Sequence, residues 1–354
     1  MRAVVLRKHG GPEVLTVEDL PEPHAGPGEV RVRVAAVAMN HLDIWVRNGL
    51  PHLKLEYPFR LGADVAGTVD EVGPGGEPDP GESPSRRANG VAAGDEVVVN
   101  PGHSCGRCRE CLSGRDNLCR FFRLMGEDIS GGYCEQIVVP AQNVVPKPKS
   151  ISFTDAAALP TTFLTAWQML TKKAPVRPGD DVLVMAAGSG VGVAAVQIAK
   201  LHGARVIATA SSDEKLARAK ALGADETINH ASQDLVAEVK RLTGKRGVDI
   251  IFEHVGAEVW PKLILSVARG GRIVTCGATS GWDARTDLRH VFFRQLEILG
   301  STMGPKGDLF PILDHVGAGR LKPIVDRTMP LAEAQAAHRL LQDRTVFGKI
   351  VLVP

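Results

Sequence analysis

The 354-residue sequence contains no apolar run approaching the roughly 20 residues needed to span a bilayer. Near the N-terminus it also lacks the long apolar core and small-residue cleavage site that mark a secretory signal. A formal net charge of only +2 gives no electrostatic case for binding nucleic acid or an anionic membrane. With 44% hydrophobic and 23% charged residues, the chain has an ordinary globular composition and is long enough for two domains. We therefore expect a cytoplasmic protein without a nucleic-acid or membrane partner.

Cysteine is scarce, and four of the six cysteines are grouped with the spacing C-x2-C-x2-C-x7-C. This clustering disfavours a disulfide framework. Four thiolates are the tetrahedral donor set that zinc prefers in closed structural sites. Free surface thiols and an iron–sulfur cluster are the alternatives, although the C-x3-C-P ending of common cluster motifs is absent. We predict one structural zinc per chain in a lobe at 100–120, bound by Cys105, Cys108, Cys111 and Cys119.

The charge of such a site also needs a partner, because four thiolates leave a divalent ion with a net double negative charge. Arginines interleave with the cysteines and are the predicted counter-charges: Arg107, Arg109, Arg115 and Arg120. The two remaining cysteines, Cys134 and Cys276, stand alone in strand-like surroundings and are predicted to be small core residues.

A small-residue turn, AAGSGVG at 186–192, lies between an apolar strand and a helix. A second apolar strand, Arg205 to Thr209, completes a β-α-β unit. The strict G-x-G-x-x-G fingerprint is absent, since Ala187 and Ser189 occupy its first two glycine positions, so the β-α-β context carries the inference. Small residues let the backbone approach a ligand, and a helix N-terminus offers free N–H groups to a pyrophosphate. We predict a dinucleotide site that uses Gly188, Ser189, Gly190 and Val191.

The two parts of the chain on either side of residue 150 have different patterns. Residues 1–150 carry short strand signals separated by turns, and 73–94 is rich in Pro, Gly, Ser and charge. We interpret 73–94 as a mobile surface loop, with a functional lid as the less favoured alternative. From 151 to 315 strands alternate with helices, which predicts a doubly wound parallel sheet. The tail, 316–354, is expected to return to the first domain through the strand Lys349 to Val353.

Several shorter features are predicted inside the second part. A helix is expected from Asp213 to Leu222, begun by a Ser211-x-x-Glu214 capping box, and a strand from Arg272 to Cys276. Ligands of a doubly wound sheet bind at the carboxyl ends of the strands. Those ends are predicted near Ala187, Ala210, Val255 and Gly277.

The end of the second strand lacks the acidic residue that NAD-specific folds use to hold the ribose hydroxyls. Ala210 occupies that place, and no carboxylate there would repel a 2′-phosphate, which Ser211 and Lys215 are suited to bind. Asp213 is an acidic residue close to this position and would favour NADH, but we interpret it as part of the start of the following helix. We therefore expect NADPH in preference to NADH.

Over essentially its full length the chain resembles the medium-chain dehydrogenase/reductase superfamily. The resemblance rests on the β-rich front part, the four-cysteine lobe, the central nucleotide fold and the late GKIVL strand. The stretches VAMNHLDIWVRNG and LPTTFLTAW are similar to the quinone oxidoreductase branch. This resemblance implies an α/β fold, with a Rossmann domain and a β-rich, GroES-like catalytic domain. It also implies a homodimer or homotetramer in which 292–303 extends the sheet across an interface, whereas the residues alone would place that segment in the core.

Compared with zinc alcohol dehydrogenases, the sequence lacks the ligands of a catalytic zinc. Asn40 stands where that family has a cysteine, Ala63-Asp64 stands where it has His-Glu, and the third ligand falls near Thr161 or Thr162. Asparagine, alanine and threonine are not zinc ligands in this chemistry. We predict that the catalytic metal is missing. The alternative is a site rebuilt at shifted positions from His41, His52 and Asp64.

Loss of that metal changes the expected substrate. Zinc lowers the pKa of bound water from about 16 to about 7, whereas a positioned acid or base contributes about 10²–10⁴ in rate. A metal-free site suits substrates that are already electrophilic, namely quinones, enones and other conjugated carbonyls, with catalysis by proximity and orientation. The alternatives are a zinc-dependent alcohol dehydrogenase and a non-enzymatic nucleotide-binding protein.

Roles for individual residues follow as hypotheses. Asn40 would hydrogen-bond the nicotinamide ribose or the substrate oxygen, while Asp64 and Thr162 could line the reaction pocket. His41 is either a proton donor or a packing residue. Asp43 and Arg47 are expected to pair and fix their segment. The residues expected to touch the cofactor, partly by resemblance, also include Asn40, Thr162, His230, Val255, Gly277 and Lys349.

Overall fold

The computed structural model describes residues 1–51, 53–74 and 91–354, so His52 and most of the predicted 73–94 loop lie outside the described residues. The chain forms two compact units, one of Met1–Thr161 with Pro305–Pro354 and the other of Thr162–Gly304. The second unit is shorter at both ends than the predicted 151–315. One reason is that α3 (Phe153–Ala157) packs on strands of the first unit.

The first unit is built on a seven-stranded sheet. Its strands are β3 (Glu29–Ala38), β4 (Asp64–Val72), β5 (Glu96–Val99), β8 (Gln136–Pro140), β9 (Val144–Pro146), β16 (Val325–Pro330) and β17 (Lys349–Val353). The order is β16-β17-β3-β4-β5-β9, and β8 pairs with β3. Because β17 pairs with β3, the last strand belongs to the sheet of the first unit.

Shorter elements complete this unit. They are β1 (Arg2–Val5), β2 (Thr16–Asp19), β6 (Gly102–His103), β7 (Arg123–Leu124), α1 (His41–Asn48), α2 (Arg109–Leu112), α10 (Leu309–Gly317) and α11 (Ala334–Gln342). Alternate residues of β3, Val30, Val32 and Val34, are buried, which is the pattern of a strand with one face on a core. Helix α4 (Pro160–Trp167) begins in this unit and continues into the second, followed by a π-helical segment at Gln168–Lys173.

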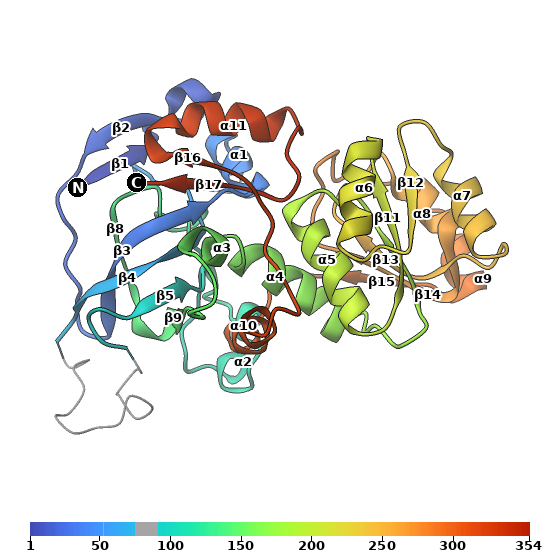
Figure 1. Ribbon diagram of the computed structural model, residues 1–354, viewed down its shortest axis with the longest axis horizontal. Coiled ribbons are helices and arrows are strands. Elements are labelled where there is room, and N and C mark those ends of the chain that lie inside the picture. The colour runs from blue at the N-terminus through green and yellow to red at the C-terminus, as the bar shows by residue number, and fades with distance from the viewer. Residues whose placement is uncertain (52, 75–90) are drawn as a thin grey trace. The chain divides into compact units, whose positions relative to one another are not determined.

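The second unit has a six-stranded parallel sheet, with helices α5 (Gly190–Leu201) and α6 (Asp213–Ala221) lying in front of it in Figure 1. Its strands are β10 (Asp181–Val184), β11 (Arg205–Ala210), β12 (Glu226–Asn229), β13 (Val248–Glu253), β14 (Val267–Thr275) and β15 (Glu297–Gly300). The order β12-β11-β10-β13-β14-β15 is that of a Rossmann fold. The strand order reverses between β10 and β13, where ligands of such folds bind.

The helices of this unit are α5 (Gly190–Leu201), α6 (Asp213–Ala221), α7 (Leu235–Leu242), α8 (Trp260–Ser266) and α9 (Leu288–Arg294). Three local predictions need correction. Ser212, not Ser211, caps α6, because its side chain accepts from Lys215 N. Strand β14 begins at Val267, before the predicted start at Arg272, and ends at Thr275. Within 292–303, residues 292–294 end α9 and Glu297–Gly300 form β15, and the exposed side chains of Phe292 and Phe293 correct the core placement that the residues alone suggested.

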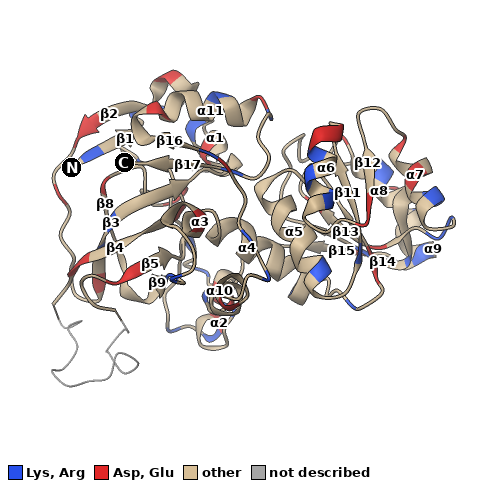
Figure 2. Ribbon diagram, in the orientation of Figure 1, with Lys and Arg blue, Asp and Glu red and all other residues tan. Residues whose placement is uncertain are grey.

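Acidic and basic residues are interspersed along the helices of the second unit, as Figure 2 shows. In the described part of the chain, no helix combines the length and apolarity needed to cross a membrane.

Candidate active site and metal centre

A buried cluster of polar side chains joins the start of α1, the start of β4 and the start of β17. Lys349 Nζ donates to Asn40 Oδ1 at 2.6 Å and to Asp64 Oδ2 at 3.1 Å. Asn40 Nδ2 donates to the same Asp64 oxygen at 2.9 Å. The other oxygen of Asp64 accepts from the backbone N and the Oγ1 of Thr161, at 2.8 and 2.6 Å. Asp64 is 0% and Lys349 4% exposed, so the charges of this pair are balanced inside the protein.

A second buried carboxylate, that of Asp43, holds the backbone beneath this cluster. Its Oδ2 accepts from Asn40 N at 2.7 Å and its Oδ1 from Gly62 N at 2.9 Å. Burial raises the pKa of Asp43 to about 6, against the lowering effect of the two N–H groups. Asp43 therefore fixes the start of α1 against the segment that leads into β4.

The predicted Asp43–Arg47 pair is wrong. Arg47 is fully buried, and its guanidinium donates to Gly10 O at 3.1 Å and lies 2.8 Å from His338 Nδ1. Tyr133 Oη lies 3.2 Å from the other nitrogen of His338. Because burial and the arginine charge lower the pKa of His338 to about 3, its ring is neutral at ordinary pH. Sequence reasoning missed this network because its members are far apart along the chain.

The residues around Asn40 do not fit a catalytic zinc. Asn40 Oδ1 and both oxygens of Asp64 already accept hydrogen bonds, and a lysine ammonium sits where a dication would have to approach. Among the described residues, which exclude His52, the Cys105–Cys119 group is the one assembly of three or more His, Cys, Asp or Glu with metal-ligating geometry. The donor chemistry of the cluster is that of a hydrogen-bonding site.

His41 and Thr162 flank this cluster in sequence. Burial, reinforced by the charges of Arg344 and Lys349, lowers the pKa of His41 to about 4. Its ring lies 6.5 Å, centroid to centroid, from that of Trp45. Thr161 supplies the two described contacts to Asp64, while Thr162 is the buried first residue of the second unit.

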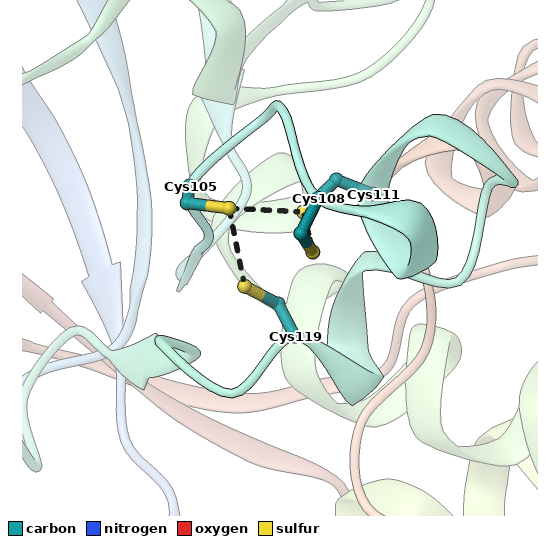
Figure 3. A group of neighbouring side chains, drawn as sticks. All are labelled: Cys105, Cys108, Cys111 and Cys119. Carbon is teal, nitrogen blue, oxygen red and sulfur yellow. Dashed lines mark hydrogen bonds between the residues drawn. The ribbon is translucent and has the colours of Figure 1, made fainter.

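The four clustered cysteines turn their sulfur atoms toward one point (Figure 3), and the sulfurs all lie within 4.8 Å of one another. Three of the S···S distances are 3.5, 3.6 and 3.9 Å. Zinc–sulfur bonds of about 2.3 Å in a tetrahedron require S···S separations of about 3.8 Å. The backbone N–H of Arg107 is the main cause that lowers the pKa of Cys105 to about 6, whereas the neighbouring thiols raise that of Cys108, so the sulfurs share their protons when no metal is bound. The donor set therefore fits a structural zinc.

The surroundings of this centre differ in part from the sequence prediction. Arg115 pairs with Glu110 at 2.8 Å, and Arg120 stacks over the ring of Phe121 at 4.7 Å. Lys306, from a distant segment of the chain, supplies a positive charge near these cysteines. Burial lowers the pKa of Lys306, opposed by Asp116 and by the thiols of Cys111 and Cys119. Of the two isolated cysteines, Cys134 is buried as predicted, and Cys276 is partly exposed.

In the second unit, the turn between β10 and α5 forms a close-fitting cradle. The Ser189 side chain caps α5 by accepting from Gly192 N at 3.0 Å. A Cβ on Gly192 would lie 2.5 Å from Ala186 O and 2.8 Å from Ala187 Cα, so only glycine fits there. Ala186 itself adopts a left-handed φ of 44°. Such strain is typical of turns that bring backbone N–H groups to a ligand.

The ends of the neighbouring strands lie at the same edge. Ala210 ends β11 and is buried, Ser211 is exposed, and no acidic side chain occupies either position. Asp213 accepts from Asn229 Nδ2 at 2.8 Å, which occupies one of its oxygens. His230 follows β12, and burial lowers its pKa.

A buried glutamate that the sequence analysis did not single out holds the loop after β13. Glu253 is 0% exposed, and its carboxylate accepts from the N–H groups of Val255 and Gly256. Thr275, at the end of β14, also donates to it at 3.3 Å. Burial raises the pKa of Glu253. This carboxylate fixes two strand ends near Val255 and Gly277.

This combination defines a class: dehydrogenases that pair a nucleotide-binding Rossmann unit with a β-rich unit carrying a metal lobe. Residues 26–149 match the family model of the alcohol dehydrogenase GroES-like domain, and residues 190–317 match that of the zinc-binding dehydrogenases. The chain belongs to the zinc-type alcohol dehydrogenase-like medium-chain dehydrogenase/reductase superfamily, and it is an oxidoreductase that uses a pyridine nucleotide.

Proteins similar to this chain have names that describe different activities. A solved structure of an "NAD-dependent alcohol dehydrogenase" is 58% identical, with a TM-score of 0.94 and full coverage of both chains. An "NAD-dependent alcohol dehydrogenase" of Sulfurisphaera tokodaii is 32% identical and fully covered in both chains. A human "Quinone oxidoreductase" is 27% identical, over 100% of this chain and 98% of that protein.

Proposed function

We propose that this protein reduces a quinone, enone or related conjugated carbonyl with NADPH, without a catalytic zinc. The observation that carries the proposal is the hydrogen-bond cluster of Asn40, Asp64, Lys349 and Thr161, in which the side-chain oxygens of Asn40 and Asp64 all accept from protein donors. A conjugated acceptor needs no metal to become electrophilic, since its own carbonyl withdraws electrons. The resemblance to the quinone oxidoreductase also supports this substrate class.

The second unit would hold the nucleotide. The N–H groups at the start of α5, with Gly188, Ser189, Gly190 and Val191, would bind the pyrophosphate, and the close fit at Gly192 supports a backbone approach there. Ser211 and Lys215 would bind a 2′-phosphate, because no carboxylate at Ala210 opposes one. Further contacts are proposed from His230, Val255, Gly277, Thr162 and Lys349. When bound, the nicotinamide supplies a hydride.

Asn40 is the proposed polar contact at the reacting end. Its side-chain N–H₂ has two hydrogens, and one of them is donated to Asp64. The other can donate to a ribose hydroxyl or to the substrate oxygen as negative charge develops there. Lys349 and Asp64 hold the amide in one orientation from both sides, so little reorganisation is needed when the charge appears.

The proton that completes the reduction is assigned to water. With a pKa of about 4, His41 carries its proton in only about one molecule in a thousand at pH 7. The neutral imidazole therefore remains a packing residue beside Trp45 in this proposal.

Zinc, assembly and location complete the proposal. One structural zinc per chain is bound by the four clustered cysteines, and their reduced state suits the cytoplasm. The protein is proposed to be a homodimer paired through β15, or a homotetramer made of two such dimers. This strand ends the six-stranded sheet, and exposed apolar side chains lie on it and on α9: Leu288, Phe292, Phe293 and Ile298.

The test combines metal analysis with a reduction assay. We expect one zinc per chain, and NADPH consumption with a panel of quinones and enones but not oxidation of simple alcohols. Two zincs per chain with metal-dependent alcohol oxidation would establish a zinc alcohol dehydrogenase, which the names of two similar proteins favour. Tight NADPH binding with no turnover on any quinone, enone or aldehyde would establish a non-enzymatic protein.

A further inference from the structure

His254 reaches the nucleotide-binding turn from a different strand. It follows β13, and the turn follows β10, and these two strands are neighbours at the point where the strand order reverses. The Nε2 atom of His254 lies 3.1 Å from Met185 O and 3.2 Å from Ser189 Oγ. The imidazole therefore contacts both the end of β10 and the capping residue of α5.

The partners of Nε2 decide which ring nitrogen carries the proton. Met185 O is a carbonyl oxygen and can only accept, so Nε2 must be the protonated nitrogen. A protonated Nε2 has no lone pair left to accept a hydrogen bond from the serine. The contact to Ser189 must then run from the ring N–H to the hydroxyl oxygen, with one N–H shared between two acceptors.

This assignment fixes the direction of the serine hydroxyl. The Ser189 oxygen accepts from Gly192 N at 3.0 Å and from His254 Nε2 at 3.2 Å. A hydroxyl has two acceptor positions and one proton. Since both acceptor positions are filled from within the protein, the O–H proton must point elsewhere.

We propose that His254 is a positioning residue that turns the Ser189 hydroxyl into an obligatory hydrogen-bond donor toward the nucleotide pyrophosphate. The inference rests on the proposed nucleotide site and adds a residue to it. A phosphate oxygen can only accept a hydrogen bond. A serine hydroxyl that rotates freely would have to be fixed in its donating orientation when the phosphate binds, and this would lower the affinity. The hydrogen bond from the His254 N–H fixes the orientation of the Ser189 hydroxyl before the ligand binds.

The histidine is held well enough to act in this way. It is 8% exposed, and its ring packs edge-on against Phe252, with centroids 6.1 Å apart. Its backbone carbonyl accepts from Thr279 Oγ1 at 3.3 Å, which ties it to the loop after β14. An imidazole confined in this way keeps one orientation relative to the turn.

Binding of ADP-ribose, which carries the pyrophosphate but no nicotinamide, tests the proposal by calorimetry without any turnover. We expect Ser189→Ala to weaken binding about tenfold and His254→Phe to weaken it about fivefold, since hydrogen bonds to charged groups are the stronger ones. Because both act through one hydroxyl, adding His254→Phe to Ser189→Ala should change binding less than about twofold. Glutamine can place an N–H near the Nε2 position, so His254→Gln should keep affinity within about twofold of the original.

Controls separate orientation from general damage. His202 is the C-cap of α5, at the opposite end of the helix from Ser189, and its Nδ1 lies 2.9 Å from Ile198 O. His202→Phe is therefore the matched variant and should leave affinity unchanged. Nitrogen NMR of the protein without ligand should show His254 protonated at Nε2. Independent, multiplying effects of the two substitutions, or a proton on Nδ1, would overturn the proposal. If ADP-ribose does not bind the original protein, the proposed function fails together with it, whereas binding without coupling removes this inference alone.

Discussion

Lys349 and Asn40 lie 309 positions apart in the sequence, yet the lysine Nζ donates a hydrogen bond of 2.6 Å to the asparagine Oδ1. The contact joins β17 to the N-cap of α1 and is completed by Asp64 at the start of β4. It gives the amide of Asn40 a single orientation, with one N–H directed at Asp64 and the other available. The proposed chemistry depends on this arrangement.

Replacing Asn40 by alanine is expected to lower the rate of hydride transfer about 10–100-fold, because a hydrogen bond to developing charge contributes about 1.5–3 kcal/mol. Single-turnover oxidation of NADPH by an enone measures the step directly. Asn48→Ala, at the other end of α1, removes a contact to Arg47 and serves as the matched control with an unchanged rate. An Asn40→Ala protein with normal hydride transfer and normal cofactor affinity would exclude the proposed role.

Metal content should depend on the clustered cysteines alone. Cys111→Ser is expected to reduce zinc well below one per chain and lower Tm by about 5–10 °C, since a structural site contributes several kcal/mol and each shifts Tm by about 2–4 °C in large domains. Plasma emission analysis and calorimetry give the two readouts. Cys134→Ala, outside the cluster, should retain its zinc. Full zinc content in Cys111→Ser would contradict the assignment.

Cofactor preference should respond to the end of β11. Ala210→Asp places a carboxylate where a 2′-phosphate would lie, so NADPH affinity is expected to fall at least about tenfold while NADH affinity rises. Lys215→Ala should weaken NADPH binding and leave NADH unchanged. Fluorescence titration of both nucleotides measures the effect. A tenfold preference of the original protein for NADH would refute the NADPH proposal.

Stability should fall on acidification partly through His338. The pKa of His338 is about 3 in the native protein and 6.5 in the unfolded chain. Between pH 3 and pH 6.5, His338 is therefore protonated in the unfolded chain and neutral in the native protein. The unfolding free energy should therefore decrease by up to about 1.4 kcal/mol per pH unit as pH falls below 6.5. Asp43 acts oppositely, since its raised pKa of about 6 makes the native state the proton acceptor between pH 6 and 3.8.

Comparison of variants isolates the histidine contribution to this pH dependence. His338→Gln should show a shallower loss of stability in denaturant unfolding between pH 6.5 and 4 than the original protein. Equal slopes for the two proteins would mean that His338 titrates normally in the native state.

The edge of the second sheet should control assembly. Ile298 is 41% exposed on β15, and Ile298→Lys places a charge in the proposed interface, which should convert the dimer to its monomer. Light scattering after size-exclusion chromatography gives the mass. Val17→Lys, on an exposed strand of the first unit, is the matched control and should leave the mass unchanged. A dimer that survives Ile298→Lys would place the interface elsewhere.

Local patterns predicted what depends on near neighbours in the chain. The C-x2-C-x2-C-x7-C spacing brings four sulfurs together because the lobe is short, and the apolar strands around 186–192 predicted the β-α-β unit. Local patterns predicted the exact ends of helices and strands less well. Ser211 and Ser212 are equally good caps, and only the turn geometry selects Ser212. Likewise, the apolar 292–303 segment is divided between the end of α9 and β15, a boundary that its apolar pattern does not mark.

The sequence by itself determined the β-α-β unit around 186–192, the cysteine centre and the absence of a carboxylate at Ala210, because each is encoded within one short segment. Tertiary structure decided the partners of charged groups. Lys349 meets Asp64, Arg47 meets His338 rather than Asp43, and His254 meets Ser189 only after distant strands become neighbours. A buried polar group must find a partner, but which one it finds depends on the three-dimensional packing that brings distant segments together.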